Sequence, residues 1–203
     1  MKTTFKITAL LILAIVLCAG KTTQAVEKTK KFSENWPANS IENLYVNNKF
    51  GEIKFVNAGG PEITVDVVVT VESPNERKAS EMLDRINVAF SKSGTTAKAE
   101  TEMNSNFNFN GKFSINYVIN IPSDKNLSVS NKYGNVVVNR LTGTGDFDVQ
   151  YGNITAVSLK GAGTRLNLAY GKGNINETGD LETNISYSNI SFGETGNLRL
   201  NSK

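Results

Sequence analysis

Four short segments of one pattern decide the fold: Tyr133-Gly134-Asn135-Val136, Tyr151-Gly152-Asn153-Ile154, Tyr170-Gly171-Lys172-Gly173-Asn174-Ile175 and Tyr187-Ser188-Asn189-Ile190. Each segment has an aromatic residue and a small residue, then, after a short insertion in one copy, Asn and a β-branched residue. The tyrosines lie 18, 19 and 17 residues apart. Self-similarity at a nearly fixed period indicates a repeat architecture.

The residues before each tyrosine have the pattern of a β-strand. Apolar residues alternate there with polar ones, at Leu127 and Val129, Phe147 and Val149, Leu166 and Leu168, and Leu181 and Ile185. This period of two is typical of a β-strand, because successive side chains of a strand point to opposite faces. A single strand–turn–strand unit cannot bury its own apolar face, whereas units stacked in parallel share one continuous core. We therefore expect an all-β chain in which residues 123–203 form a right-handed parallel β-solenoid.

Alignment of the units on their tyrosines predicts two columns of side chains. An outward column should hold charges of alternating sign that form ion pairs between units; it consists of Asp146, Arg165 and Glu182. A second column should form an amide ladder; it consists of Asn135, Asn153, Asn174 and Asn189.

The orientation of the tyrosines has two interpretations. Each tyrosine lies two residues after an inward position, as Tyr151 follows Val149 and Tyr170 follows Leu168, so strict alternation places the rings in the core. We favour this inward packing. Outward rings would instead form an aromatic stripe able to stack on sugar rings or on the side chains of a partner.

Residues 41–122 are predicted to form an antiparallel strand region with one helix. Two strands are expected within 41–57 and 63–71. A helix of about 74–91 should follow the capping box Ser73-Pro74-Asn75-Glu76 and bury an apolar face made of Ala79, Met82, Leu83, Ile86 and Phe90. The turn dipeptide Asn110-Gly111 predicts a hairpin over about 98–121. A looser copy of the repeat, Asn48-Lys49-Phe50-Gly51-Glu52-Ile53, also lies in this region.

The first 25 residues have the features of a signal peptide. Lys2 and Lys6 precede an apolar run from residue 7 to 17 that is too short to span a bilayer. We favour cleavage after Ala25, because Thr23-Gln24-Ala25 offers small residues for signal peptidase. The alternative is lipid attachment at Cys18, although Leu17 before it is unusual for a lipoprotein signal. Both alternatives predict an exported protein of the periplasm or cell surface, without a transmembrane helix after the signal is removed.

The charge of the exported chain argues against a nucleic-acid partner. Lys2, Lys6 and Lys21 account for the whole net charge of +3. The remaining chain is close to neutral and lacks the basic surface that releases counterions from phosphates. Residues 26–40, which include Lys28-Thr29-Lys30-Lys31, are expected to be a solvated N-terminal tail.

The residue types limit the chemistry that is possible. The sequence has no histidine, and its single cysteine, Cys18, would leave with the signal peptide. Histidine-based catalysis and most transition-metal sites are thereby excluded. Asp146 and Asp148 are the obvious carboxylate pair for a glycosidase, but they flank the inward Phe147 and should both face solvent. We therefore predict no catalytic, cofactor-binding or metal-binding residue.

The last residues follow the same template as the earlier units. Leu198, Leu200 and Ser202 correspond to positions 127, 129 and 131, which places the next aromatic just past Lys203. We therefore expect the native chain to continue.

The pattern resembles the bacterial putative-adhesin family of exported β-solenoid domains, which includes heads of auto-transporter adhesins. The resemblance rests on the Tyr-Gly-Asn repeats, on Leu83-Asp84-Arg85-Ile86 and on Val118-Ile119-Asn120-Ile121-Pro122. It implies a location in the envelope or outside the cell and no catalytic residues.

Three hypotheses of function follow. The first is a non-enzymatic scaffold at the cell surface or in the periplasm that binds a glycan, an envelope component or another protein. The second is a structural or envelope-stress-linked protein without an external ligand. The third, which we favour least, is a carbohydrate-active enzyme. An exposed aromatic or amide ladder would favour the first, and a cleft with two buried acids the third.

Overall fold

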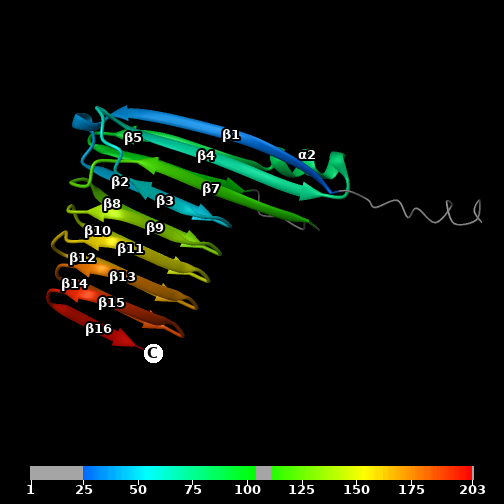
Figure 1. Ribbon diagram of the computed structural model, residues 1–203. Helices are drawn as coiled ribbons and strands as arrows, with labels where there is room; N and C mark the ends of the chain where they lie inside the picture. The colour runs from blue at the N-terminus through cyan, green and yellow to red at the C-terminus, as the bar shows by residue number, and fades with distance from the viewer. Residues whose placement is uncertain (1–24, 104–110, 203) are drawn as a thin grey trace, which may run out of the picture.

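The computed structural model describes residues 25–103 and 111–202, which form two eight-stranded sheets that face each other around one core (Figure 1). Sheet A has the order β1 (Val26–Pro37), β4 (Glu62–Ser73), β7 (Lys112–Asn120), β3 (Ile53–Val56), β9 (Val136–Leu141), β11 (Asn153–Leu159), β13 (Lys172–Thr178) and β15 (Asn189–Thr195). Sheet B has the order β16 (Leu198–Ser202), β14 (Leu181–Ser186), β12 (Thr164–Ala169), β10 (Gly145–Gln150), β8 (Asn126–Lys132), β2 (Asn43–Lys49), β6 (Thr96–Met103) and β5 (Ile86–Ser93).

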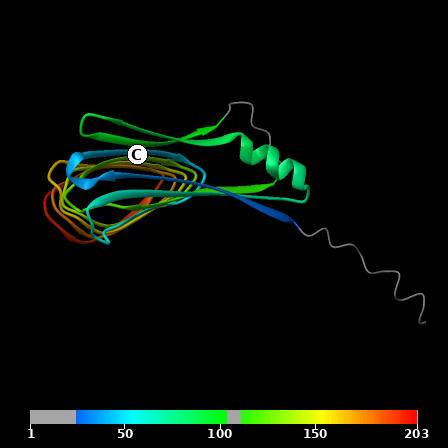
Figure 2. The same ribbon diagram turned by 90° about the horizontal axis from the view of Figure 1, so that it is seen from above.

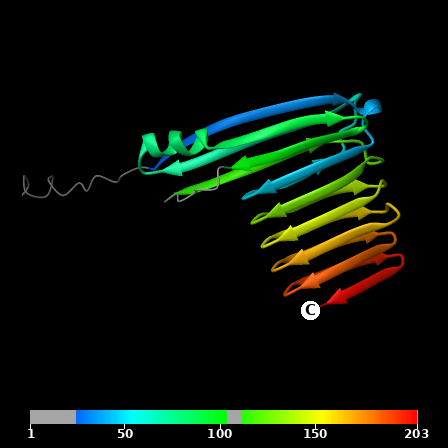
Figure 3. The same ribbon diagram turned by 180° about the vertical axis from the view of Figure 1, so that it is seen from behind.

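The C-terminal half is a stack of similar units, each with one strand in either sheet. From β8 onward consecutive strands alternate between sheet B and sheet A, and every strand pairs in parallel with the strand one unit away. We call one such unit a rung. Figure 3 shows the rungs descending one below another, and Figure 2, seen along the stack, shows them superimposed as a flattened loop. The parallel stacking predicted for residues 123–203 is therefore present.

The N-terminal half extends both sheets with antiparallel strands, so each sheet is mixed. Strands β2 and β3 form a rung that pairs in parallel with β8 and β9, which agrees with the looser repeat copy around Phe50. Beyond this rung, β4 pairs antiparallel with β7 and β1, and β5 pairs antiparallel with β6. The all-β class is confirmed, and the strands are partly antiparallel.

The tail predicted for residues 26–40 is wrong. Residues Val26–Pro37 form the twelve-residue strand β1, and a 3-10 turn, η2 (Ala38–Ser40), follows it. Alternate side chains of β1 are half-buried and exposed along the sheet edge. The half-buried lysines have protein partners, because the Lys28 ammonium donates to Ser80 and that of Lys30 donates to the Ile86 carbonyl. The segment is a strand because its backbone pairs with β4 from Val26 to Pro37, and this pairing does not depend on apolar side chains. Of the predicted signal peptide, only Ala25 lies within the described residues.

The hairpin predicted over about 98–121 is also wrong. Strand β6 lies in sheet B between β2 and β5, whereas β7 lies in sheet A between β4 and β3. A period of two in the sequence identifies a strand but does not show with which strand it pairs. The hairpin prediction rested on the turn dipeptide alone. Asn110 lies outside the described residues.

The helix is shorter than predicted. Helix α2 covers Glu76–Asp84 and packs against β1, β4 and β5 through Ala79, Met82 and Leu83. The expected helical positions Ile86 and Phe90 lie in β5 instead. The alternating residues of 86–90 fit a strand as well as a helix face, and pairing with β6 selects the strand. No helix in the described residues has the length and apolar character needed to cross a membrane.

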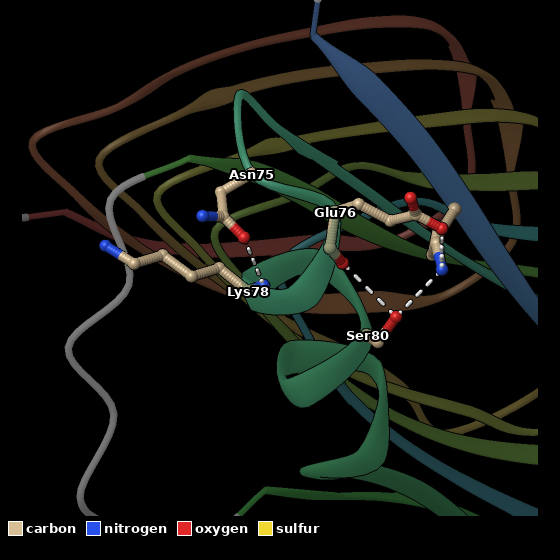
Figure 4. A network of polar contacts seen from close by, with 5 residues as sticks. Asn75, Glu76, Lys78 and Ser80 are labelled. Atoms are coloured by element: carbon tan, nitrogen blue, oxygen red, sulfur yellow. Dashed lines mark hydrogen bonds and ion pairs between the residues drawn. The ribbon is translucent and has the colours of Figure 1, made fainter.

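Polar contacts hold the start of α2 against β1 (Figure 4). The N-cap is Asn75, not Ser73, and its side-chain oxygen accepts a hydrogen bond from the Lys78 amide at 3.1 Å. Lys28 of β1 donates to Ser80 at 2.9 Å and pairs with Glu76 at 2.8 Å. The hydrogen bond and charge of Lys28 lower the pKa of Glu76.

Candidate functional site

One turn of every rung carries an aromatic ring, and these rings form a continuous stack. We call it the aromatic ladder; its members are Phe50, Tyr133, Tyr151, Tyr170 and Tyr187. Successive ring centroids lie 5.1, 5.1, 4.8 and 5.0 Å apart, with interplanar angles of 11°, 19°, 1° and 9°. This spacing follows from the distance between neighbouring strands, about 4.8 Å.

The ladder points outward, so the prediction that the tyrosines face the core is wrong. Relative exposure is 42% for Tyr133, 46% for Tyr151, 49% for Tyr170 and 73% for Tyr187. The physical reason is the backbone: these residues have φ between 50° and 61°, in the left-handed region. Strand alternation ends where the chain turns, and a left-handed residue directs its side chain away from the face that alternation predicts.

Glycines after the aromatics let the turns stack closely. A Cβ placed on Gly152 would lie 1.9 Å from the Gly134 carbonyl oxygen, and one on Gly171 would lie 1.8 Å from that of Gly152. The Tyr133 amide donates to the Gln150 carbonyl at 2.9 Å, and the Tyr151 amide donates to Ala169 at 2.9 Å. The small residue of the repeat is therefore required by the approach of one turn to the next.

The amide column contains only part of the predicted set. Asn153 donates from its backbone and side chain to the Asn135 side-chain oxygen, both at 3.1 Å. The next residue in the column is Lys172, whose amide donates to the Asn153 side-chain oxygen at 3.0 Å. Lys172 in turn pairs with Asn189 on the adjacent strand. Asn174 pairs instead with Thr155. The residues 172–173, taken as an insertion in the sequence, are ordinary rung positions, so the prediction for Asn174 is wrong.

The charged column has the predicted register. Asp146 pairs with Arg165, and Arg165 pairs with Glu182, on adjacent strands of sheet B. Arg165 and Glu182 form the predicted ion pair, with 3.7 Å between Nε and Oε2. Among the ion pairs of the described residues there is none between Asp146 and Arg165, so that part of the prediction is wrong. Asp146 is exposed as expected, and half-buried Asp148 accepts a hydrogen bond from the Gln150 side chain at 3.1 Å.

Lysines next to the ladder give one end of it a positive charge. Lys49 and Lys132 are paired residues of β2 and β8, each directly before an aromatic residue. The Lys49 ammonium lies 5.2 Å from the Phe50 centroid, and that of Lys132 lies 5.2 Å from Tyr133 and 5.8 Å from Tyr151. Sequence reasoning missed these lysines, although the shared sequences Asn48-Lys49-Phe50 and Asn131-Lys132-Tyr133 contained the signal.

The stacking decides which part of each ring is accessible. Neighbouring rings cover both faces of Tyr133, Tyr151 and Tyr170, so solvent reaches their edges and hydroxyl groups. A ligand at the ladder would thus contact a row of ring edges and phenol hydroxyls. Sugar rings could not stack on the faces of the inner tyrosines.

Comparison with known proteins yields similar structures but no family. No protein-family model and no curated protein matches the sequence. A putative cell adhesion protein from Clostridium sporogenes is 10% identical with a TM-score of 0.49, over 87% of this chain and 99% of that one. A putative adhesin from Parabacteroides distasonis is 12% identical with a TM-score of 0.49, over 85% and 78%. A putative adhesin from Bacteroides fragilis is 12% identical with a TM-score of 0.31, over 86% and 97%. At these scores the likeness gives no information about the function of this chain.

Proposed function

We propose that this protein is a non-enzymatic binding scaffold, a right-handed β-solenoid whose aromatic ladder is its contact surface for an envelope component or another protein. The observation that carries the proposal is the outward position of four tyrosines on successive rungs. A row of exposed aromatic edges and hydroxyl groups can bury apolar area while it forms hydrogen bonds, which is why tyrosine is enriched at interfaces.

The residue type at these turns supports a role beyond folding. Glycine or asparagine adopts the left-handed conformation at little cost, whereas tyrosine does not. Stacking between the rings offsets part of this cost, by about 0.5–1.5 kcal/mol for each pair. The rings nevertheless remain about half exposed, and contiguous exposed aromatic surface is typical of interaction sites.

The signal peptide of residues 1–25 would place this scaffold outside the cytoplasm, in the periplasm or at the cell surface. Cleavage after Ala25 would release it, and lipid attachment at Cys18 would anchor it. The resemblance of the Tyr-Gly-Asn repeats to exported adhesin domains supports the same location. A structural envelope role without an external ligand is the second candidate, since the ladder also joins the turns to one another.

The experiment is cosedimentation of the purified chain with isolated bacterial envelopes. The test variant is Tyr151→Asn/Tyr170→Asn, because asparagine tolerates left-handed backbone and should preserve the turns. The control is Val157→Asn on β11, an exposed apolar residue outside the ladder. Circular dichroism and thermal unfolding verify folding of both variants.

We expect saturable binding by the wild-type chain and by Val157→Asn, and loss of binding by the ladder variant. Absence of binding to every envelope fraction would contradict the proposal and favour the structural role. Equal binding by the folded ladder variant would also contradict it.

A further inference from the structure

Two hollows lie on the outer face of sheet B, near the ends of the strands opposite the ladder, and we call the strip of surface that contains both of them the furrow. Two rows of side chains border it, and each row crosses the strands in register. The first row, from the start of each strand, contains Asn43, Asn126, Thr144, Gly163, Asp180 and Asn197. The second row, two residues later, contains Tyr45, Ser128, Asp146, Arg165, Glu182 and Arg199.

The furrow is hollowed at two places along the same two rows. A hollow of about 470 Å³ lies over β6, β2, β8 and the start of β10, with Tyr45, Lys98 and Ser128 in its lining. A second hollow of about 360 Å³ lies over β12, β14 and β16, lined by Arg165, Glu182 and Arg199 among others. An occupant of both hollows would lie along the stacking axis and cross the rungs one after another.

Tyr45 differs from the ladder tyrosines in what lies beside its ring. On the β6 side, the Lys98 ammonium lies 5.6 Å from the ring centroid. On the β8 side, the paired residue is Ser128, whose side chain is too short to cover an aromatic ring. No other described aromatic ring stacks on Tyr45, so its β8 side opens into the hollow. A sugar ring can therefore stack there, which it cannot do on the inner ladder rings.

The charges of the furrow cancel. Asp146, Asp180 and Glu182 are balanced by Lys98, Arg165 and Arg199. A polyanion would gain no net attraction along such a surface. Alternating carboxylates, guanidinium groups and amides do provide donors and acceptors for a ligand that carries many hydroxyl groups.

We propose that this furrow binds an extended neutral glycan, with one pyranose unit at each rung and one sugar ring against Tyr45. The rung spacing of about 4.8 Å is close to the length of one pyranose in an extended β-linked chain, so the contacts can repeat. This surface is separate from the ladder, which lies at the other ends of the same strands.

The test uses the full chain in cosedimentation with cellulose, chitin and an insoluble β-1,3-glucan, and affinity electrophoresis in gels that contain polygalacturonate. Tyr45→Thr removes the ring and keeps a β-branched residue suited to a strand. The matched control is the ladder variant Tyr151→Asn/Tyr170→Asn, which removes aromatic rings outside the furrow.

We expect binding to at least one neutral glycan, weakened about tenfold or more by Tyr45→Thr, the size expected when one aromatic contact is lost. The ladder variant Tyr151→Asn/Tyr170→Asn should bind that glycan like the wild type. The inference is overturned if no neutral glycan binds, if only polygalacturonate binds, or if folded Tyr45→Thr binds normally. None of these results affects envelope binding through the ladder, which the ladder variant reports separately.

Discussion

Tyr151 and Tyr170 stack face to face, with ring centroids 4.8 Å apart and ring planes 1° apart, although they belong to different turns. Both residues have left-handed backbone, with φ of 54° and 55°. The same turn conformation thus directs the rings outward and aligns them. The same residues therefore affect both the stability of the stack and the chemistry of its surface. Substitutions that differ in backbone preference can distinguish the two effects.

Substitution of Tyr151 should depend on the backbone preference of the new residue as well as on lost stacking. Tyr151→Asn loses two ring contacts but relieves the left-handed strain, so we expect about 1 kcal/mol of destabilisation. Tyr151→Val loses the same contacts and adds a β-branched residue at positive φ, so we expect about 2–3 kcal/mol. Urea unfolding measures both values. Equal losses for Asn and Val would refute the role of the backbone.

Gly152→Ala should be costly because the turns touch. Its Cβ would lie 1.9 Å from the Gly134 carbonyl oxygen, so the stack must open at this point. We expect about 3 kcal/mol of destabilisation, at the upper end for overpacking. The control is Gly59→Ala, where φ is 74° but no atom lies within 4 Å of the added Cβ, and there we expect about 1 kcal/mol. Similar losses at both glycines would mean that the turns do not need their close contact.

The buried hydroxyl of Tyr117 is a structural group. Thr101 donates to the Asn48 side-chain oxygen at 2.8 Å, and its single proton is thereby used, so the Tyr117 hydroxyl donates to the Thr101 oxygen at 2.7 Å. Burial raises the pKa of Tyr117, which keeps the hydroxyl protonated as a donor. We expect Tyr117→Phe to cost about 1 kcal/mol. Thr101→Val should cost about 2–3 kcal/mol, because it leaves two buried groups without this partner. Chemical denaturation of the two variants checks the order, and a larger loss for Tyr117→Phe would contradict the network.

Glu177 should contribute to stability at neutral pH and lose that contribution in acid. Its hydrogen bond with Lys160, 2.8 Å long, and the charge of Lys160 lower the pKa of Glu177 below the ordinary value of 4.5. The folded state therefore binds the proton less readily than the unfolded chain, and the contribution present above pH 4.5 disappears as the pH falls through the lowered pKa.

Glu177→Gln tests this pH dependence. Its melting temperature should be lower than that of the wild type at neutral pH, and the difference should shrink as the pH falls below the ordinary pKa. Thermal unfolding across this range provides the measurement. A difference that stays constant with pH would show that the carboxylate charge is not involved.

The features that depend on the period of the repeat could be predicted from the sequence. Equal spacing of the tyrosines predicted the parallel stacking, and alignment on them placed Asp146, Arg165 and Glu182 in one column. The rings themselves were misplaced because alternation was extended one residue too far, into a left-handed turn. A repeated aromatic directly before glycine is the local signal for this turn conformation, and strand alternation alone does not distinguish it from the end of a strand.

Strand partners in the N-terminal half could not be predicted in the same way. The segments of β6 and β7 alternate as strands should, yet they lie in different sheets. Strand β6 pairs with its neighbour in the chain, β5, and with distant β2, whereas both partners of β7, β4 and β3, are distant in the chain. The sequence of β1 alternates only weakly between polar and apolar residues, so its pairing with β4 is determined by the tertiary structure. The furrow was also hidden, because it depends on the short side chain of Ser128 lying beside Tyr45 on another strand.

Nitration of tyrosines in the envelope-bound protein shows directly whether the ladder is the contact surface. Tetranitromethane modifies the exposed ring edge beside the hydroxyl, and mass spectrometry locates each product. Buried Tyr117 should remain unreactive in free and bound protein and serves as the internal control. We expect Tyr151 and Tyr170 to react in the free chain and to be protected in the pelleted complex. Equal nitration of these two rings in free and bound protein would contradict the ladder as the contact surface.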